Sequence, residues 1–372
     1  MPIQTHPIAS EPGLANYTLS VCRYGREGSG RKAYIQAALH ADEVPAMLVA
    51  HCLRRLLDQY EAEGRVRGEI VLVPAANPIG LSQLVHGTPF GRFDLGTGIN
   101  FNRDFRHVAE ELKDKLAGRL GPHAEANVGL VREAARAAVA SWEPEDATEV
   151  LKKTLLSMAI DADIVLDLHC DNEALMHVYA GTALRDKAVP LAALLGARAL
   201  LLSSASGGAP FDEACSRLWW DLAEHFGPQT PVPPACAAVT VELRGEMDVR
   251  YDYAEQDAKA LLQYLAREGL LDIPVEELPE AQCAPTALEA VEPLHATQAG
   301  VLVFHKQLGE RVEAGEAVAD IVNPVSGAVV TLRARHPGLL FARTAHRHLL
   351  RGMQVCKIAG LTPFRTGSLL SD

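Results

Sequence analysis

Apolar and polar positions along residues 17–268 follow two different periods, one typical of strands and one typical of helices. Apolar runs of strand length cover residues 17–25, 32–40, 68–78, 163–169, 176–181, 197–204 and 237–245. Apolar positions at helical spacing cover residues 44–60, a long region from about 107 to 160, and residues 211–226 and 253–268. Fully apolar strands that alternate with helices indicate an α/β fold, in which a sheet is covered by helices on both faces.

The pattern changes near residue 273. Residues 273–290 are rich in proline and glutamate and have no sustained period, which predicts a linker after an α/β domain at residues 1–272. Residues 291–372 alternate short valine-rich runs with glycine turns, as small all-β barrels do. This part resembles a lipoyl or biotinyl domain, but its turn at residues 323–326 reads Asn-Pro-Val-Ser, so we expect a related barrel without an attachment lysine.

Composition narrows the class of protein. Of the 372 residues, 48% are hydrophobic and 22% are charged, and no apolar run is long enough for a membrane span. The formal charge of −12 disfavours a nucleic-acid partner, which would require a basic face. No secretory leader is visible, and the seven cysteines are scattered without a C-x-x-C pair. We therefore expect a cytoplasmic protein that folds in water.

Histidine and glutamate side chains follow the predicted strands where a metal site would be expected. His40 ends the strand at residues 32–40, Glu43 follows three residues later, and His169 ends the strand at residues 163–169. Open α/β sheets bind ligands beyond the carboxyl ends of their strands. Two histidines and one glutamate are a known ligand set for a catalytic zinc ion, which keeps an open fourth position. The sequence thus predicts one Zn²⁺ per chain at these residues.

The H-x-x-E spacing is weak evidence when taken alone. His107 and Glu110 have the same spacing in a region that is predicted to be an ordinary helix. Cys170, beside His169, is an alternative ligand, although a buried apolar thiol fits its position better. The prediction of a metal site therefore rests on the combination of two strand ends.

Other polar residues could complete an active site. Glu242 ends the strand at residues 237–245 in the same way and could act as a general base; the alternative is a glutamate paired with Arg244 or Arg250. Arg92 could polarise a scissile carbonyl. Asn102 and Arg103 join an amide donor to a planar cation suited to binding a carboxylate.

Taken in order, His40-x-x-Glu43, Asn102-Arg103, His169 and Glu242 resemble the zinc carboxypeptidase superfamily, specifically its succinylglutamate desuccinylase/aspartoacylase branch. The resemblance implies a mixed sheet flanked by helices, a β-rich C-terminal domain and a zinc-dependent amide hydrolase. In such an enzyme the metal ligands are His40, Glu43 and His169, and Glu242 is the general base. Arg92 assists the oxyanion, while Asn102 and Arg103 bind a substrate carboxylate.

One residue departs from the pattern of the superfamily. Asn100 stands where carboxypeptidases carry an aspartate. We expect it to accept a hydrogen bond from a ligand histidine, with less power than a carboxylate to raise the basicity of that histidine.

Three functions compete at this point. The first is a deacylase that acts on a small acylated amino acid. A β-aspartyl dipeptide hydrolase of the cyanophycin type belongs to the same hypothesis, because it would use the same chemistry. The second is an inactive binding protein of the same fold. The third is a carrier or interaction role for the β domain, which would require a covalent adduct. The sequence does not indicate an oligomeric state.

A final expectation concerns the substrate. Asp171 and Glu173 follow His169 and should lie at the mouth of the metal site. With the acidic balance of the chain, they predict a pocket that accepts a cationic group beside the carboxylate bound by Arg103. The alternative is a solvated loop.

Overall fold

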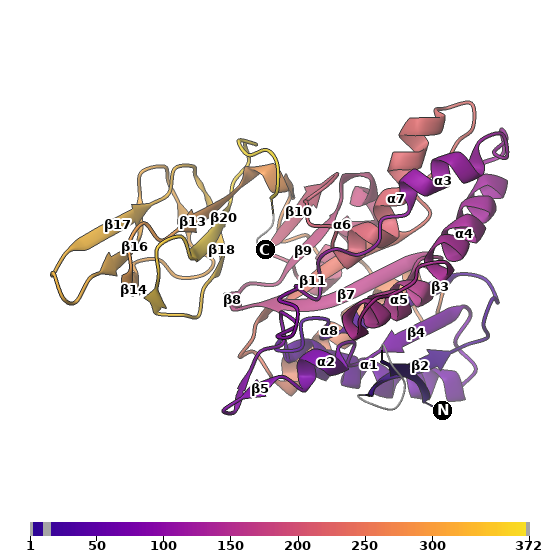
Figure 1. The fold of residues 1–372 in the computed structure, drawn as a ribbon, viewed down its shortest axis with the longest axis horizontal. Coiled ribbons are helices and arrows are strands. Elements are labelled where there is room, and N and C mark those ends of the chain that lie inside the picture. Colours follow the sequence, from indigo (N-terminus) through magenta and orange to yellow (C-terminus); the bar gives the residue numbers. More distant parts are fainter. Residues whose placement is uncertain (1–2, 10–15, 370–372) are drawn as a thin grey trace.

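The computed structural model describes residues 3–9 and 16–369. Its largest element is a nine-stranded mixed sheet (Figure 1), which confirms the predicted α/β class. From one edge to the other, its strands are β1 (Gln4–Ile8), β2 (Tyr17–Tyr24), β4 (Glu69–Val73), β3 (Lys32–Ala37), β7 (Ile164–Asp171), β11 (Ala237–Gly245), β9 (His177–Gly181), β10 (Ala199–Ser203) and β12 (Pro285–Ala287). The central strands β4, β3, β7 and β11 are parallel, so their carboxyl ends meet at one edge of the sheet.

Helices cover both faces of this sheet, as predicted. Alternate residues of β3 enter two separate hydrophobic cores, because successive side chains of a strand point to opposite faces. One core contains α1 (Pro45–Ala62), α6 (Arg185–Leu195) and α8 (Tyr251–Arg267). The other contains α3 (Ala109–Leu116), α4 (Ala124–Ala140), α5 (Ala147–Ala159) and α7 (Phe211–Phe226). No helix within residues 3–9 and 16–369 is long and apolar enough to cross a membrane.

The helical region predicted at residues 107–160 consists of three helices, α3, α4 and α5. The first break contains Gly118, whose φ is +71°, and Pro122, and the second contains Pro144. A proline lacks an amide donor and restricts the residue before it, and a positive φ cannot continue a helix. Short elements connect the larger ones, namely α2 (Pro78–Leu81), the hairpin β5 (Leu84–Val85) and β6 (Thr88–Pro89), and the 3₁₀ helix η1 (Thr182–Leu184).

The C-terminal part is β-rich, as predicted, and it projects from one side of the α/β part (Figure 1). One of its sheets holds β13 (Val291–His295), β20 (Gln354–Ala359), β18 (Gly338–Arg343) and β15 (Arg311–Val312). The other holds β17 (Val329–Arg333), β16 (Ala317–Val322), β14 (Gly300–Phe304) and β19 (His348–Leu349). Both sheets contribute to one hydrophobic core.

The segment predicted as a linker contains two short regular elements. Within it, β12 pairs with β10 at the edge of the nine-stranded sheet, and the 3₁₀ helix η2 (Leu288–Ala290) buries Leu288 among apolar residues of both parts. A second connection is β8 (Glu173–Ala174), which pairs with β18. The C-terminal part is therefore attached to the α/β part by strand pairing and by apolar packing.

Candidate metal centre and active-site cavity

The loop between β3 and α1 positions two of the predicted ligands. The chain turns after β3 at Ala38, whose φ is +59°, and the amide of Glu43 donates to the carbonyl of His40 over 3.2 Å. This turn places both side chains on the inner side of the loop, where His40 is 4% and Glu43 is 5% exposed. The polar turn can be buried because Glu43 has partners on β7, where the amide of Cys170 donates to its Oε2 over 3.1 Å and His169 Nδ1 lies 2.7 Å away.

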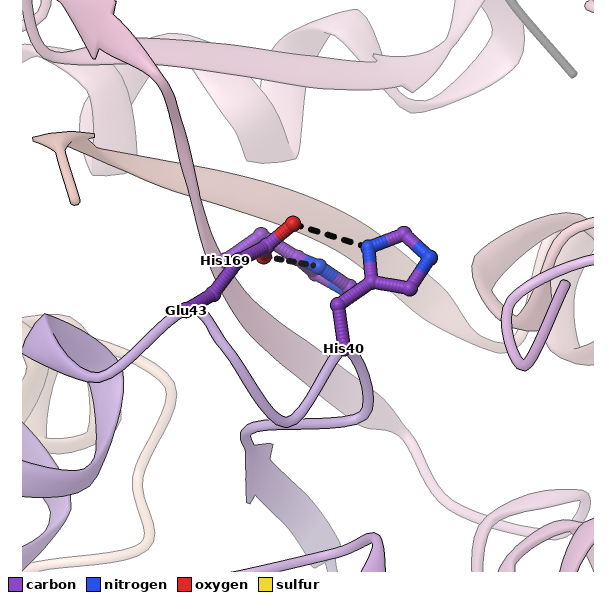
Figure 2. Close-up of side chains that lie close together, drawn as sticks. All are labelled: His40, Glu43 and His169. Carbon is purple, nitrogen blue, oxygen red and sulfur yellow. Dashed lines mark hydrogen bonds and ion pairs between the residues drawn. The ribbon is translucent and has the colours of Figure 1, made fainter. Parts of the chain in front are cut away.

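His40, Glu43 and His169 form one compact cluster (Figure 2), in which each residue offers a ligand atom within 4.8 Å of the others. The two oxygens of Glu43 lie between the two imidazoles, with Oε1 2.8 Å from His40 Nδ1 and Oε2 2.7 Å from His169 Nδ1. Among the described residues, no other group of three or more histidines, cysteines or acids is arranged to hold a metal ion.

Second partners fix the orientation of both imidazoles. Asn100 Oδ1 lies 2.8 Å from His40 Nε2, as predicted, and Asp167 Oδ2 lies 2.9 Å from His169 Nε2. Asn100 Oδ1 can accept the Nε2 proton of His40, and the carboxylate of Asp167 forms an ion pair with the ring of His169. The Nδ1 atoms of both rings face Glu43 at the centre of the cluster. Metal-binding histidines usually have such an acceptor behind them. The two nitrogens and the carboxylate thus fit a zinc ion in both chemistry and orientation.

The charges of this cluster are strongly coupled. Burial alone would raise the pKa of Glu43, but the charges of His40 and His169 outweigh it and lower the pKa. Burial lowers the pKa of His40, although the carboxylate of Glu43 opposes this shift. Burial opposes the positive charge of His169 too, but Asp167 and Glu43 raise its pKa well above the usual value. Without a metal, the cluster therefore holds a proton on His169 that a metal must displace.

The affinity for zinc should accordingly depend on pH. Because one proton leaves His169 when the metal binds, we expect the apparent affinity to fall about tenfold for each pH unit below the raised pKa of His169. Above that pKa the affinity should level off. Competition with a chromophoric chelator between pH 6 and 9 measures this slope, and a constant affinity over the range would contradict protonation of His169.

Glu242 lies beside the cluster, since it is paired in register with His169 on the neighbouring strand. It lines the same cavity, and its Oε2 atom is buried without a hydrogen-bond partner among the described residues. Burial, followed by the charge of Glu43, raises its pKa to about 8. A carboxyl whose pKa lies near neutral pH is suited to accept and return a proton.

Arg92 reaches the cluster from the segment that follows β6. Its Nη1 atom lies 3.3 Å from His40 Nδ1 and 3.6 Å from Glu43 Oε1. Gly91 makes this possible, because it packs on the loop after β3, where a Cβ atom would lie only 2.2 Å from the amide nitrogen of Asp42. The amide of Ala41 also donates to the carbonyl of Gly91 over 3.0 Å. The structure thus brings Arg92 to the metal centre.

Asn102 and Arg103 approach from the side of His169. Asn102 Nδ2 lies 3.4 Å from His169 Nε2, and its Oδ1 accepts from the amide of Phe211 over 2.9 Å. Arg103 Nη1 donates to the carbonyl of Asn102 over 2.8 Å. Gly208, with a φ of +73°, lies against this arginine, where a Cβ would come within 2.6 Å of Arg103 Cδ. Both predicted binding residues line the cavity.

The expected cation-binding role of Asp171 and Glu173 needs correction. Lys357, on β20, pairs with Asp171 at 2.5 Å, and Glu173 pairs with Arg343 and Arg347 at 2.6 Å each. Glu173 is also absent from the cavity wall, although Asp171 contributes to it. Both carboxylates are thus balanced by cations of the C-terminal part, and they present no uncompensated negative charge to a substrate.

Asp167 and Lys357 lie at the candidate site but were not predicted from the sequence. Asp167 precedes His169 by two positions, so both side chains lie on the same face of β7, and the D-x-H spacing could have indicated it. Lys357 lines the cavity from the C-terminal part; burial would lower its pKa, but Asp171 and Tyr179 outweigh this and raise it. No sequence pattern indicated Lys357, since its position depends on the docking of β20. Cys170 is buried, as expected, and lies outside the cluster.

The cluster opens into a cavity of about 930 Å³. Its wall includes the loop after β3, the segment 88–103, the ends of β7 and β11, and residues of the C-terminal part. Pockets of roughly 300–1,000 Å³ enclose most small ligands, so the cavity is large enough for a substrate to lie across the metal centre. The α/β part and the C-terminal part enclose it together.

Comparison with known proteins agrees with this geometry. The family model of the succinylglutamate desuccinylase/aspartoacylase catalytic domain matches residues 29–131. No curated protein matches the sequence. The structure of a succinylglutamate desuccinylase/aspartoacylase family protein from Shewanella amazonensis is 27% identical, covers 96% of this chain and 98% of that chain, and has a TM-score of 0.82.

Two further structures support the fold. A succinylglutamate desuccinylase/aspartoacylase from Shewanella frigidimarina is 25% identical, with 96% of this chain and 97% of that chain covered and a TM-score of 0.81. The product-bound ectoine utilization protein EutE (DoeB) from Ruegeria pomeroyi is 20% identical, with coverages of 94% and 90% and a TM-score of 0.64, and it shows similarity of fold alone.

The matched catalytic domain and the similar structures bear the names of hydrolases, and in this chain the histidine and glutamate cluster fits a metal site. The family model spans His40, Glu43, Arg92, Asn102 and Arg103, while His169 and Glu242 lie beyond it. The predicted resemblance to the succinylglutamate desuccinylase/aspartoacylase family is therefore confirmed, over residues 29–131 by the family model and over nearly the whole chain by solved structures.

Proposed function

We propose that the protein is a zinc-dependent hydrolase that cleaves the amide bond of a small acylated amino acid. His40, Glu43 and His169 would hold the ion, which supplies Lewis-acid chemistry and lowers the pKa of water when bound. The observation that carries the proposal is the placement of two buried imidazoles around one carboxylate, directly beside Glu242 and Arg92 in a single cavity. Deacylation and dipeptide hydrolysis share this chemistry.

Glu242 is assigned the proton transfers. Its carboxylate takes a proton from water as the water oxygen bonds to the carbonyl carbon of the substrate. The same proton is then given to the amine as the C–N bond breaks, so water and amide become a carboxylic acid and an amine. The raised pKa of Glu242 supports both steps, because a group that titrates near neutral pH can gain and lose a proton readily.

Arg92 and Arg103 are assigned to different parts of the substrate. Arg92, which contacts the His40 side of the cluster, stabilises the negative charge that develops on the carbonyl oxygen. Arg103, together with Asn102 on the His169 side, binds the carboxylate of the amino acid. The scissile bond would then lie between the two arginines, beside Glu242.

A substrate panel tests this function. Zinc-loaded protein is incubated with N-acetyl, N-succinyl and N-octanoyl amino acids and with α- and β-linked dipeptides, and release of a primary amine is measured. We expect at least one compound with a free α-carboxylate to be hydrolysed at a rate that depends on zinc. Failure to hydrolyse any amide in the panel would contradict the proposed function.

Replacing Arg103 should mainly affect binding. Lysine keeps the charge but lacks the planar pair of donors, so in the Arg103→Lys variant we expect KM for a carboxylate substrate to rise at least about tenfold, with a smaller change in kcat. The methyl ester of the same substrate should be nearly insensitive to the substitution. Equal KM values for wild type and variant with the free carboxylate would refute this role.

A further inference from the structure

Five apolar side chains at the mouth of the cavity remain exposed to solvent. We call them the apolar lip, which consists of Val44, Phe90, Phe93, Leu95 and Met247. Their exposed fractions are 39%, 43%, 39%, 54% and 89%, respectively. Apolar side chains grouped in this way around a pocket are typical of a surface that binds an apolar ligand. The mechanism proposed above assigns no role to them.

Hydrogen bonds hold the segment that carries Phe90, Phe93 and Leu95. The side chain of Gln83 donates through Nε2 to the carbonyls of Phe90 and Phe93, over 2.5 and 2.7 Å, and accepts through Oε1 from the amide of Leu95 over 2.8 Å. Thr148, on α5, donates to the carboxylate of Asp94 over 2.8 Å. The aromatic side chains are therefore presented by a fixed segment, which lowers the entropic cost of ligand binding.

Two members of the lip are close to Arg92 in the sequence. Phe90 and Phe93 flank Arg92, which contacts His40, whereas Asn102 and Arg103 lie at the side of His169. If Arg92 binds the carbonyl oxygen and Arg103 binds the carboxylate of the amino acid, the acyl chain must extend from Arg92. Its path then leads along Phe90 and Phe93 toward the mouth of the cavity.

We propose that the acyl group of the substrate is an apolar aliphatic chain, longer than acetyl, that packs on the apolar lip. This inference rests on the proposed function, because it assigns the acyl side of the same site. The volume of about 930 Å³ supports it, since an acetyl or succinyl amino acid would leave much of such a cavity unfilled. Two cations that line the cavity from the C-terminal part are already engaged, since Lys357 pairs with Asp171 and Arg365 donates to the carbonyls of Val291 and Leu369.

A series of substrates that differ only in the acyl chain tests the proposal. The N-acetyl, N-succinyl, N-butanoyl and N-octanoyl derivatives of one amino acid are compared by kcat/KM with the zinc-loaded full chain. We expect N-octanoyl to exceed N-acetyl by at least about tenfold, the lower end of the discrimination that one methylene gives in an apolar pocket. N-succinyl should be no better than N-acetyl.

Two variants of the same hairpin region localise the effect. Phe90→Ser should reduce the ratio of octanoyl to acetyl kcat/KM severalfold, because it removes an aromatic member of the lip. Leu84→Ser is the matched control, since Leu84 is 63% exposed on β5 but lies outside the cavity wall, and it should preserve the ratio. If Phe90→Ser is poorly folded by circular dichroism, Leu95→Ser takes its place.

The outcomes separate this inference from the proposed function. Hydrolysis of N-acetyl or N-succinyl substrates as fast as N-octanoyl would overturn the inference and leave the hydrolase intact. The inference would also be overturned by an octanoyl preference that both Phe90→Ser and Leu95→Ser retain. If no member of the series is hydrolysed, the proposed function itself fails.

Discussion

The His169→Ala variant should lose both its zinc and its activity. His169 supplies one of only two imidazoles in the cluster, and its Nδ1 lies 2.7 Å from the carboxylate of Glu43. Without it, the remaining ligands would be one histidine and one carboxylate, too few for a stable zinc site. We expect elemental analysis after dialysis to find less than about a tenth of the wild-type zinc content, and amide hydrolysis to fall to background.

His107→Ala is the control for this experiment. His107 and Glu110 repeat the H-x-x-E spacing of His40 and Glu43, but His107 instead pairs with Asp221 at 2.8 Å, away from the cluster. This variant should therefore retain zinc and activity. Full zinc occupancy in His169→Ala would show that the ligand assignment is wrong.

The Glu242→Gln variant should separate metal binding from catalysis. Glutamine has nearly the same shape as glutamate but cannot accept the proton from water, so we expect kcat to fall by at least ~10²-fold. The zinc content should be unchanged, because Glu242 is not a member of the metal-binding cluster. Zinc content is measured by elemental analysis. In the same preparation, kcat is measured by stopped assays of amine release and normalised to bound zinc.

The Glu246→Gln variant tests whether the loss of any carboxylate in the cavity lowers kcat. Glu246 also lines the cavity, but the side chain of Asn172 donates to it over 2.5 Å. Its substitution should reduce kcat much less than that of Glu242. Near-normal turnover of Glu242→Gln would leave Glu242 with a structural role only.

The strands and the cluster of polar side chains at their ends could be predicted because their signals are local. His40 and His169 each end a fully apolar run, and the parallel arrangement of β3 and β7 brings such ends together. The hydrogen bond from His40 to Asn100 also follows from a motif. The strand period is encoded over short segments, and the alternation of strands with helices favours parallel strands whose carboxyl ends share one edge.

Features that depend on docking between the two parts could not be predicted. The sequence gives no sign that Lys357, 186 residues after Asp171, would neutralise that carboxylate. Because the sequence does not show these cationic partners, the acidic residues after His169 were predicted to form a cation-binding pocket. The ordered β12 within the predicted linker is a similar case, since its pairing with β10 depends on a partner far away in the sequence.

Restoring the metal to stripped protein tests the central claim most directly. The protein is freed of metal with a chelator, zinc is added in small steps, and bound zinc and amine release from the best substrate of the panel are measured together. We predict that activity rises in proportion to bound zinc and reaches its plateau at about one ion per chain, as a single cluster of three ligands requires. Full activity in the metal-free protein, or saturation of a specific site without any gain in amide hydrolysis, would contradict the account.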